Sequence, residues 1–547
     1  MAKKKRALTL DEPILHADHK LRSRRDFIRQ GLITGPGLIL GGGVFSLFSN
    51  PREVMAQVSG DLTELANSFS NITCQIGGLT GDAKIPFIAF DLGGGAGISS
   101  NVLVGQQNGQ LDTLDAAGYS KMGIPGNMTP GQVDAAPALA GTNGDFTDTS
   151  LGLAFHSDAG FLRGIDVRAP TLRNSGLVDG CVIAARSDND TGNNPHNPMY
   201  GIAMAGAKGG VTTLIGSVSS ESGARSMSPA TLLNPELRPT KVDRPSDVTG
   251  MVDVGDLTTI LTAEDVTAVM EAMARISHKK MRRGDIQTGI SRDAVIKELV
   301  ACGYLRAADL TDRFANIEVD PSADDKIVGA TGIFSDAEWN AGDGAAREYQ
   351  KTASVMKMVI DGHAGAGSIT MGGYDYHTGE RGTGERRDFL AGECIGACLD
   401  YARRMTTPVM IYVYSDGSVS SNGRIDTTPA GRDKPEWTGD NSSTACSFFL
   451  VYNPGGVPLF NNGLPAEKHR QLGWYTAGGS VVTTSSSAAN NVNALAHTAI
   501  LNFMALNGDV TPGNFNNFTS LFTNSNGIPT HGINNLASMI AFGDLTP

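Results

Sequence analysis

The sequence lacks the features of several large protein classes. Beyond residue 56 it has no apolar run of about 20 residues, the length that a membrane-spanning helix needs, so we expect the chain after that point to be soluble. It contains no Gly-x-Ser-x-Gly elbow, and its glycine runs lack the spacing and the lysine of a phosphate-binding loop. The sequence therefore gives no basis for a Ser-His-Asp triad and only weak support for a nucleotide site.

Basic residues are scarce once the first 56 residues are set aside. Lys and Arg number 44 against 56 Asp and Glu in the whole chain, and 34 against 51 after residue 56, a formal charge of −17. A surface of this sign repels phosphate backbones and anionic lipid. We therefore expect neither a nucleic acid partner nor peripheral membrane binding, whereas cation binding is favoured.

The six cysteines form no Cys-x-x-Cys pattern, which argues against a metal or redox motif of that kind. Cys394 and Cys398 are one helical turn apart, a spacing that places two small side chains on the same buried face. Disulfides are permitted if the protein is exported to an oxidising compartment. Core positions and long-range pairing both remain open for Cys74, Cys181, Cys302 and Cys446.

Residues 1–56 have the three parts of an export signal. A basic start that includes the pair Arg24-Arg25 precedes an apolar, glycine-containing run at 31–48, and Val54-Met55-Ala56 offers a small-residue exit. The glycines make the run less apolar and less helical than a spanning helix. We therefore expect a twin-arginine signal peptide, read by the twin-arginine translocation machinery and cleaved near Ala56, with no stable membrane anchor left behind.

Short apolar runs alternate with helical segments in the rest of the chain. The runs expected to form strands lie at residues 85–90, 181–185, 368–371, 409–414 and 447–452. A capping box at Ser335-Asp336-Ala337-Glu338 predicts a helix to about residue 360, and apolar residues at helical spacing predict another at 385–405. This alternation predicts an α/β fold with a mostly parallel central sheet flanked by helices.

Composition also suggests how the chain is organised. Residues 57–255 are expected to form the first part of the α/β domain, with a polar excursion away from the sheet at 218–255. Helices predicted at 262–281 and 293–308 make residues 256–316 a small helical insert or cap. The second part of the α/β domain follows at 317–506, and residues 507–547 form an Asn/Gly-rich extension of turns and short elements.

Acidic residues follow four of the expected strands directly. Asp91 ends the first strand, the segment 186–190 carries two aspartates after the second, and Asp375 and Asp416 follow the strands at 368–371 and 409–414. Ligands of open α/β sheets bind outside the carboxyl ends of the strands, so these carboxylates are expected to converge. Because convergent carboxylates repel each other unless a cation or proton lies between them, the pattern favours a metal site. A turn-forming role is the alternative for each aspartate alone.

Asp375 and His377 are two residues apart. On an extended segment both side chains point the same way, as two ligands of one metal must. A turn aspartate beside a surface histidine is the alternative.

The loop at 188–198 is the most polar in the chain. Its Asp and Asn oxygens suit a hard cation such as Ca²⁺, although the spacing of an EF-hand is absent. A rigid surface loop held by its own side-chain to backbone hydrogen bonds explains the composition equally well.

Several motifs together resemble a known family. Beside the arginine pair, they are Phe90-Asp91-Leu92-Gly93-Gly94, Gly372-Gly373-Tyr374-Asp375-Tyr376-His377 and Tyr414-Ser415-Asp416-Gly417. They resemble a large, uncharacterised bacterial family of twin-arginine-exported proteins, which looks like a branch of the alkaline phosphatase and sulfatase superfamily. The resemblance implies an alkaline-phosphatase-like fold in which strand-end residues, here Asp91, Asp375 and His377, bind one or two divalent metals that act on a phosphate or sulfate ester.

The chain departs from the family pattern at three places. Asp416 replaces the acid of a Ser-Glu-Phe-Gly-Arg turn, and Asp440 stands in a Gly-Thr-Asp-His-Gly motif that here lacks its histidine. His196 lies where the family has Ser-His-Phe, so the serine of that segment is missing. Asp416, Asp440 and His196 complete the expected metal ligands, and Thr191 and Ser187 are the remaining hydroxyls that could act as nucleophile.

The sequence therefore predicts an exported, periplasmic or secreted metal-binding protein that, if active, hydrolyses phosphate or sulfate esters with a divalent metal such as Zn, Mg or Ca. The alternative is a non-catalytic binding or structural protein of the periplasm or cell surface, for example in a secretion assembly, because a fold can be kept without turnover. The sequence predicts no oligomeric state.

Overall fold

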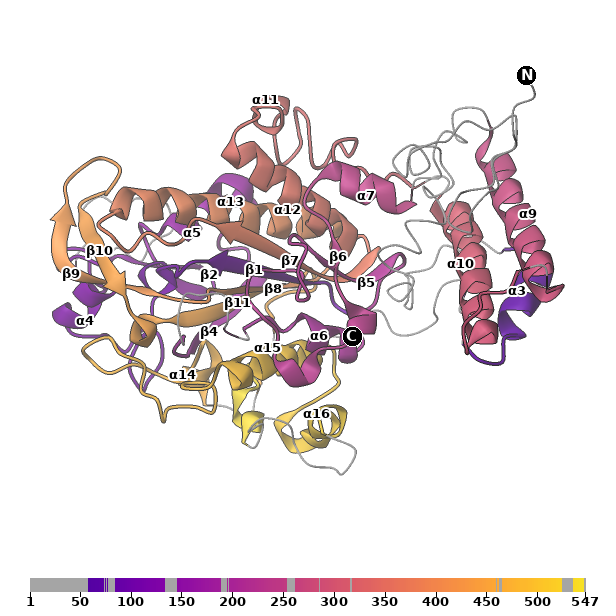
Figure 1. Ribbon diagram of the computed structural model, residues 1–547. Coiled ribbons are helices and arrows are strands. Elements are labelled where there is room, and N and C mark those ends of the chain that lie inside the picture. Colours follow the sequence, from indigo (N-terminus) through magenta and orange to yellow (C-terminus); the bar gives the residue numbers. More distant parts are fainter. Residues whose placement is uncertain are drawn as a thin grey trace, which may run out of the picture. The chain divides into compact units, whose positions relative to one another are not determined.

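The computed structural model describes residues 58–72, 74, 76, 84–132, 145–187, 194, 196–252, 261–284, 286–314, 317–458, 460–461, 465–523 and 535–545 (Figure 1). The expected signal peptide and most of the loop at 188–195, Thr191 included, lie outside these residues. The chain divides into two compact units, one with residues 58–74 and 252–315 and one with residues 75–251 and 316–547. We call them the helical unit and the sheet unit.

Among the helices that the structure describes, none combines the length and the apolar character needed to cross a membrane.

An eight-stranded sheet forms the centre of the sheet unit, in the order β12-β4-β11-β8-β1-β7-β5-β6. Only β11 runs antiparallel to its neighbours in this sheet, β4 and β8, and the other adjacent pairs are parallel. The expected mostly parallel α/β fold is thus confirmed. The strands are β1 (Phe87–Gly93), β4 (Val178–Ala184), β5 (Thr212–Gly216), β6 (Thr240–Lys241), β7 (Ala364–Gly372), β8 (Val409–Tyr414), β11 (Cys446–Tyr452) and β12 (Gln471–Leu472).

Helices cover both faces of this sheet (Figure 1). On one face lie α5 (Gly160–Arg168), α12 (Gly344–Ile360) and α13 (Arg381–Met405), and on the other α6 (Met199–Met204) and α15 (Val492–Leu506). The strands between them are buried on both faces, which explains their continuous apolar runs. Helix α15 is buried on all sides, as expected for a helix with almost no polar face.

Two small antiparallel hairpins stand outside the main sheet. One pairs β2 (Thr147–Leu151) with β3 (Leu153–His156), and the other pairs β9 (Val419–Asp426) with β10 (Lys434–Asp440). The second hairpin follows β8 directly and so lies near the carboxyl edge of the sheet.

Short helices connect these elements. The short α-helices are α4 (Ala116–Lys121), α7 (Pro245–Val252), α11 (Asp336–Trp339), α14 (Ala466–His469) and α16 (Asn516–Leu521). The 3₁₀ helices are η1 (Ile98–Ser100), η2 (Pro170–Leu172), η3 (Ala230–Leu232), η4 (Pro235–Leu237), η5 (Ser442–Thr444), η6 (Pro512–Asn514) and η7 (Leu536–Met539).

Some expected elements differ in the structure. The helix predicted from Ser335 to about residue 360 is two helices, α11 with its capping box and α12, because Gly342 takes a φ of 71° between them. The segment at 218–255 was expected to leave the sheet, yet β6 adds an edge strand parallel to β5. The extension after residue 507 does consist of short elements, but Phe518, Leu536 and Phe542 are buried in the core with α15.

The helical unit consists of α3 (Gly60–Asn67), α9 (Ala263–Arg282) and α10 (Asp293–Phe314). The latter two are the helices predicted from the sequence, although α10 extends to residue 314. A disulfide between Cys74 and Cys302 joins its two chain segments, whereas Cys181, Cys394, Cys398 and Cys446 are buried free thiols. The predicted bounds of the helical insert, 256–316, and of the C-terminal extension, 507–547, stay a prediction.

Candidate metal centre

The segment after β7 alternates between buried and accessible side chains. Tyr374 and Tyr376 are fully buried, Asp375 is exposed and His377 is partly exposed. This two-residue period places Asp375 and His377 on the same side of an extended segment, as the sequence predicted. The two buried tyrosines hold the segment against the protein while its other face meets solvent.

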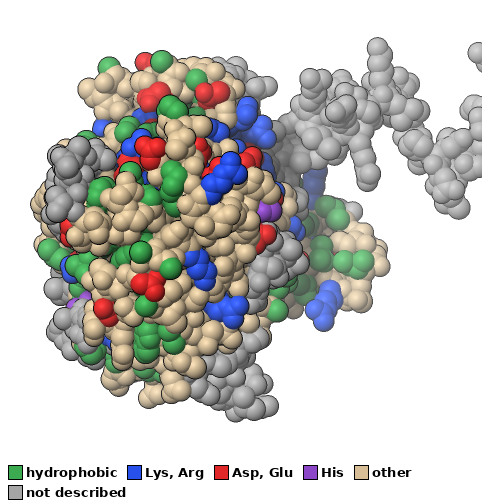
Figure 2. Space-filling view, turned by 90° about the vertical axis from the view of Figure 1, so that its left-hand side faces the viewer, with side chains coloured by type: hydrophobic (Ala, Val, Ile, Leu, Met, Phe, Trp, Pro, Cys, Tyr) green, Lys and Arg blue, Asp and Glu red, His purple; other side chains and the backbone are tan. Residues whose placement is uncertain are grey.

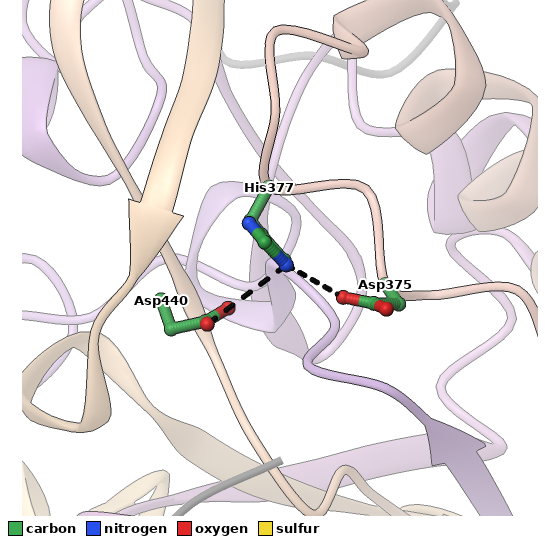
Figure 3. Close-up of side chains that lie close together, drawn as sticks. All are labelled: Asp375, His377 and Asp440. Carbon is green, nitrogen blue, oxygen red and sulfur yellow. Dashed lines mark ion pairs between the residues drawn. The ribbon is translucent and has the colours of Figure 1, made fainter.

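A third acidic residue reaches this segment from the second hairpin. Asp440 ends β10, and Figure 3 shows its carboxylate and that of Asp375 pointing toward His377 from opposite sides. His377 Nε2 lies 2.8 Å from Asp375 Oδ1 and 3.9 Å from Asp440 Oδ2. One ligand atom from each residue falls within 4.8 Å of the other two, so a single cation could contact all three.

Glycine is required where β1 and the Asp375 segment meet. Gly94 follows β1 with a φ of 125°, and a Cβ there would lie 2.5 Å from the backbone nitrogen of Asp375. Gly373 has a φ of 89° and lies against the guanidinium of Arg387. At both positions the backbone has a conformation that L side chains rarely adopt, and another group lies close by. A larger residue at either position would therefore disturb the backbone around Asp375.

A buried network holds Tyr376. Its hydroxyl accepts a hydrogen bond from the Gly97 N–H, 2.9 Å, and donates to Asp388 Oδ1, 3.3 Å. The other Asp388 oxygen accepts from Asn101 Nδ2, 2.7 Å. Burial and the nearby charge of Glu385 raise the pKa of Asp388, the Asn101 hydrogen bond and the charges of Arg381 and Lys434 lower it, and the net pKa is about 7. The segment carrying Asp375 and His377 is therefore tied to α13 by an acid that titrates near neutral pH.

The second hairpin is anchored by charge and aromatic contacts. Lys434 at the start of β10 is buried and lies 2.8 Å from Glu385 and 3.2 Å from Asp158. Burial raises the pKa of Glu385, but Lys434, Arg381 and Arg163 outweigh it and lower the value to about 2. Trp437 packs against Tyr376, with 6.1 Å between ring centroids, so the strand that carries Asp440 contacts the segment that carries His377.

Two expected ligands, Asp91 and Asp416, do not belong to this group of three. Asp91 is fully buried and accepts hydrogen bonds from the Arg225 and Ser226 N–H groups, the Ser226 hydroxyl and the Thr370 hydroxyl. Burial raises its pKa although these bonds oppose the shift. Asp416 is buried and accepts from the Gly94 N–H at 2.8 Å. Both carboxylates thus fix loops at the carboxyl edge, and their role as ligands stays a prediction.

The remaining predicted residues lie on the loop after β4. His196 is buried and stacks on Tyr414, and neither ring nitrogen hydrogen-bonds to a residue that the structure describes. Burial lowers its pKa to about 4, so the imidazole is neutral near pH 7. Ser187 is also buried, with no hydrogen-bond partner for its hydroxyl within the described ranges. Thr191 lies outside those ranges.

Two arginines that lie at the carboxyl ends of β1 and β7 were not identified from the sequence. Arg225 lies against Gly93, where a Cβ would be 2.7 Å from its Cδ, and Arg387 lies against Gly373. Neither guanidinium forms an ion pair with a described residue. No local motif marks them, because Arg225 belongs to a Ser-rich stretch and Arg387 to the first turns of α13. The Arg225 side chain is exposed and that of Arg387 is partly exposed.

Figure 2 views the molecule from the side on which β9 and β10 lie in Figure 1. Acidic and basic side chains are scattered there among uncharged ones, with no broad patch of one sign. The acidic character of the whole sequence is therefore not concentrated on this face.

No protein-family model matches the chain, and no curated protein matches it. Solved structures of the alkaline phosphatase from the Antarctic bacterium TAB5 resemble it weakly. A mutant form with Mg bound in its M3 site is 13% identical over 73% of this chain and 96% of that one, with a TM-score of 0.23. The structure described simply as that enzyme is 12% identical with the same coverage and a TM-score of 0.21. Similarity at this level carries no conclusion about the metal centre.

Proposed function

We propose that this protein binds a divalent metal through Asp375, His377 and Asp440. The observation that carries the proposal is the convergence of one nitrogen and two carboxylate ligands, from segments 63 residues apart, within 4.8 Å. The protein supplies three ligands, and two of them, Asp375 and Asp440, are exposed. A metal bound here would keep an open coordination position for water or a substrate, as in catalytic rather than structural sites. A histidine with two carboxylates suits Zn²⁺ and also accommodates Mg²⁺.

Metal content of the purified protein tests this proposal. Wild type is expected to retain about one Zn²⁺ per chain after dialysis, measured by elemental analysis and titration calorimetry. His377→Ala and Asp375→Asn should lose it, whereas Asp325→Asn, at an exposed aspartate elsewhere on the sheet unit, should keep it. Wild type without bound metal, or equal retention by all variants, would contradict the proposal.

Hydrolysis of phosphate or sulfate esters is the reaction that this centre suits best. A bound divalent metal supplies a Lewis acid that stabilises negative charge on the ester and on an attacking oxygen. Arg225 and Arg387, held against Gly93 and Gly373, add guanidinium groups that match the geometry of a tetrahedral anion. Among the hydroxyls considered as nucleophiles, Ser187 is buried and Thr191 lies outside the described residues, so the residue that attacks is not assigned.

A chromogenic ester assay separates hydrolase from binder. A hydrolase turns over nitrophenyl phosphate or sulfate, and Arg387→Ala should lower kcat/KM while metal content stays constant. A binding protein holds inorganic phosphate without turnover, and the same variant should weaken that affinity. Arg424→Ala on β9, an exposed arginine, is the matched control. Absence of both turnover and phosphate affinity in metal-loaded protein would overturn the role in ester chemistry.

Export by the twin-arginine pathway is part of the proposal. It is supported by the arginine pair and apolar run at 1–56 and by the Cys74–Cys302 disulfide, a bond typical of oxidising compartments. Replacing Arg24 and Arg25 by Lys should retain the protein in the cytoplasmic fraction. An unchanged distribution between fractions would contradict export by this route.

A further inference from the structure

The region where α9 ends and α10 begins is strongly basic. Lys279, Lys280 and Arg282 lie in the last turn of α9, Arg283 caps it, and Arg292 precedes α10. All five are exposed, and none forms an ion pair with a described residue. We call residues 276–284 and 286–292 the basic corner of the helical unit.

The acidic residues near the basic corner are outnumbered by its cations or engaged in contacts. The sequence places one aspartate, Asp285, between Arg283 and Ile286, against five lysines and arginines. Asp293 lies 2.7 Å from Lys297 and accepts hydrogen bonds from the Thr288 backbone and hydroxyl. Glu271, one turn before the corner, is held by Arg275 and Ser59. The positive charge of the corner is therefore not neutralised by these carboxylates.

Isoleucines are exposed among these cations. Ile276 is 56% exposed, Ile286 45% and Ile290 51%, which places them among the most accessible large apolar side chains of the described residues. A single exposed apolar residue is ordinary. Here three lie within fifteen positions that also carry exposed cations, so the two features call for one explanation.

The favourable placement of cations at a helix C-terminus explains only part of this pattern. The helix dipole favours Lys279, Lys280 and Arg282 in the last turn of α9. It accounts for neither Arg292, which precedes the start of α10, nor the exposed isoleucines. A partner that is both anionic and apolar accounts for all of them.

We propose that the basic corner docks on an anionic lipid surface, with Ile276, Ile286 and Ile290 entering the interface and the cations contacting lipid phosphates. Apolar side chains flanked by Lys and Arg are typical of segments that lie at a membrane interface. Nucleic acid fits less well, because its backbone offers charge but no apolar layer for the isoleucines.

The acidity of the whole chain does not oppose this local contact. The formal charge is −12, but charges separated by more than a Debye length, about 8 to 10 Å at physiological salt, are largely screened. The charge of the corner, rather than that of the whole chain, therefore governs its approach to a bilayer. The sequence-based expectation of no peripheral membrane binding considered only the total charge.

Vesicle binding of the full chain tests the inference. Vesicles of phosphatidylcholine with about 30% phosphatidylglycerol should bind the protein at low salt, and pure phosphatidylcholine vesicles should bind it weakly. The triple variant Lys279→Ala, Lys280→Ala, Arg283→Ala should lower partitioning by about 10-fold or more, and high salt should abolish the difference. The variant Ile286→Ser, Ile290→Ser should bind more weakly at every salt concentration.

The controls separate the basic corner from other sources of binding. Arg244→Ala with Arg424→Ala removes exposed cations elsewhere, and Leu111→Ser with Val457→Ser removes exposed apolar side chains elsewhere; both double variants should bind as wild type does. Every variant keeps residues 1–56, so a contribution from that segment is common to all. An intact Cys74–Cys302 bond and an unchanged circular dichroism spectrum show that the helical unit is folded.

Three results would overturn the proposal. The first is no binding of wild type to the anionic vesicles at low salt. The second is an equal loss of binding in the corner and control variants. The third is tight binding of a short DNA duplex through the basic corner with no binding to vesicles, which would assign the surface to polyanions.

Discussion

The Tyr376 hydroxyl donates a hydrogen bond to Asp388 while accepting one from the Gly97 N–H. Tyr376 stands between Asp375 and His377 in the sequence, so this buried contact fixes the backbone that presents both proposed ligands. The network that positions the three proposed ligands is thus more deeply buried than the ligands themselves.

Tyr376→Phe is expected to destabilise the protein by about 1 to 3 kcal/mol, because it leaves the buried Gly97 N–H without its acceptor and Asp388 without one donor. Metal affinity should fall less than in His377→Ala, since both ligands remain. Urea unfolding and titration with Zn²⁺ measure the two effects. Tyr374→Phe is the matched control, because that hydroxyl makes a single bond, to the Arg387 carbonyl. Equal losses in the two variants would show that the double contact of Tyr376 has no special role.

Asp388→Asn should change how stability depends on pH. Burial raises the pKa of Asp388 from 3.8 to about 7, so the folded chain keeps a proton that the unfolded chain releases near pH 4. The stabilisation from this proton is complete below about pH 4 and is lost as pH rises through about 7. The amide does not titrate. The free energy of unfolding of the variant, relative to that of wild type, should therefore be higher at pH 8 than at pH 5.

Unfolding free energies at the two pH values measure this difference. His156 and His196, whose pKa values burial lowers to about 4, titrate in both proteins and cancel in the comparison. A constant difference between variant and wild type across this range would rule out a raised pKa at Asp388.

Lys434→Met is expected to cost about 3 to 5 kcal/mol, because it leaves the buried carboxylates of Asp158 and Glu385 without one of their cations. Arg424→Ala on the neighbouring strand breaks an exposed pair with Glu436 and should cost less than about 1 kcal/mol. Thermal unfolding measures both. Metal affinity should also fall in Lys434→Met, since β10 carries Asp440. Comparable stability of the two variants would contradict the anchoring role of Lys434.

Gly94→Ala should destabilise the protein by about 1 to 3 kcal/mol or more, because its φ of 125° is strained for alanine and the new Cβ would meet the Asp375 nitrogen. Metal affinity should fall with it. Gly344→Ala, in the first turn of α12 with no atom near the new Cβ, should be neutral or stabilising by up to about 1 kcal/mol. Denaturant unfolding of both variants makes the comparison, and a tolerated Gly94→Ala would show that β1 and the Asp375 segment can separate.

The sequence predicted the parts of the fold that local patterns encode. The buried strands β1, β7, β8 and β11 appear as apolar runs, and the spacing of Asp375 and His377 shows that both face one way. Asp440 entered the predicted ligand set only through the family resemblance. Its strand β10 has no apolar alternation and is held by two contacts distant in sequence, Lys434 with Glu385 on α13 and Trp437 with Tyr376. Arg225 could not be predicted either, since only the fold brings its loop to Asp91 and Gly93.

The Cys74–Cys302 bond closes a covalent ring that contains strands β1 to β6. A protease that cuts once anywhere between these cysteines opens the ring without dividing the molecule. The nicked protein should therefore migrate as one species on a denaturing gel until a reductant separates it into two fragments. Cleavage within this stretch is invisible under non-reducing conditions, so proteolytic mapping of the accessible loops must be read after reduction.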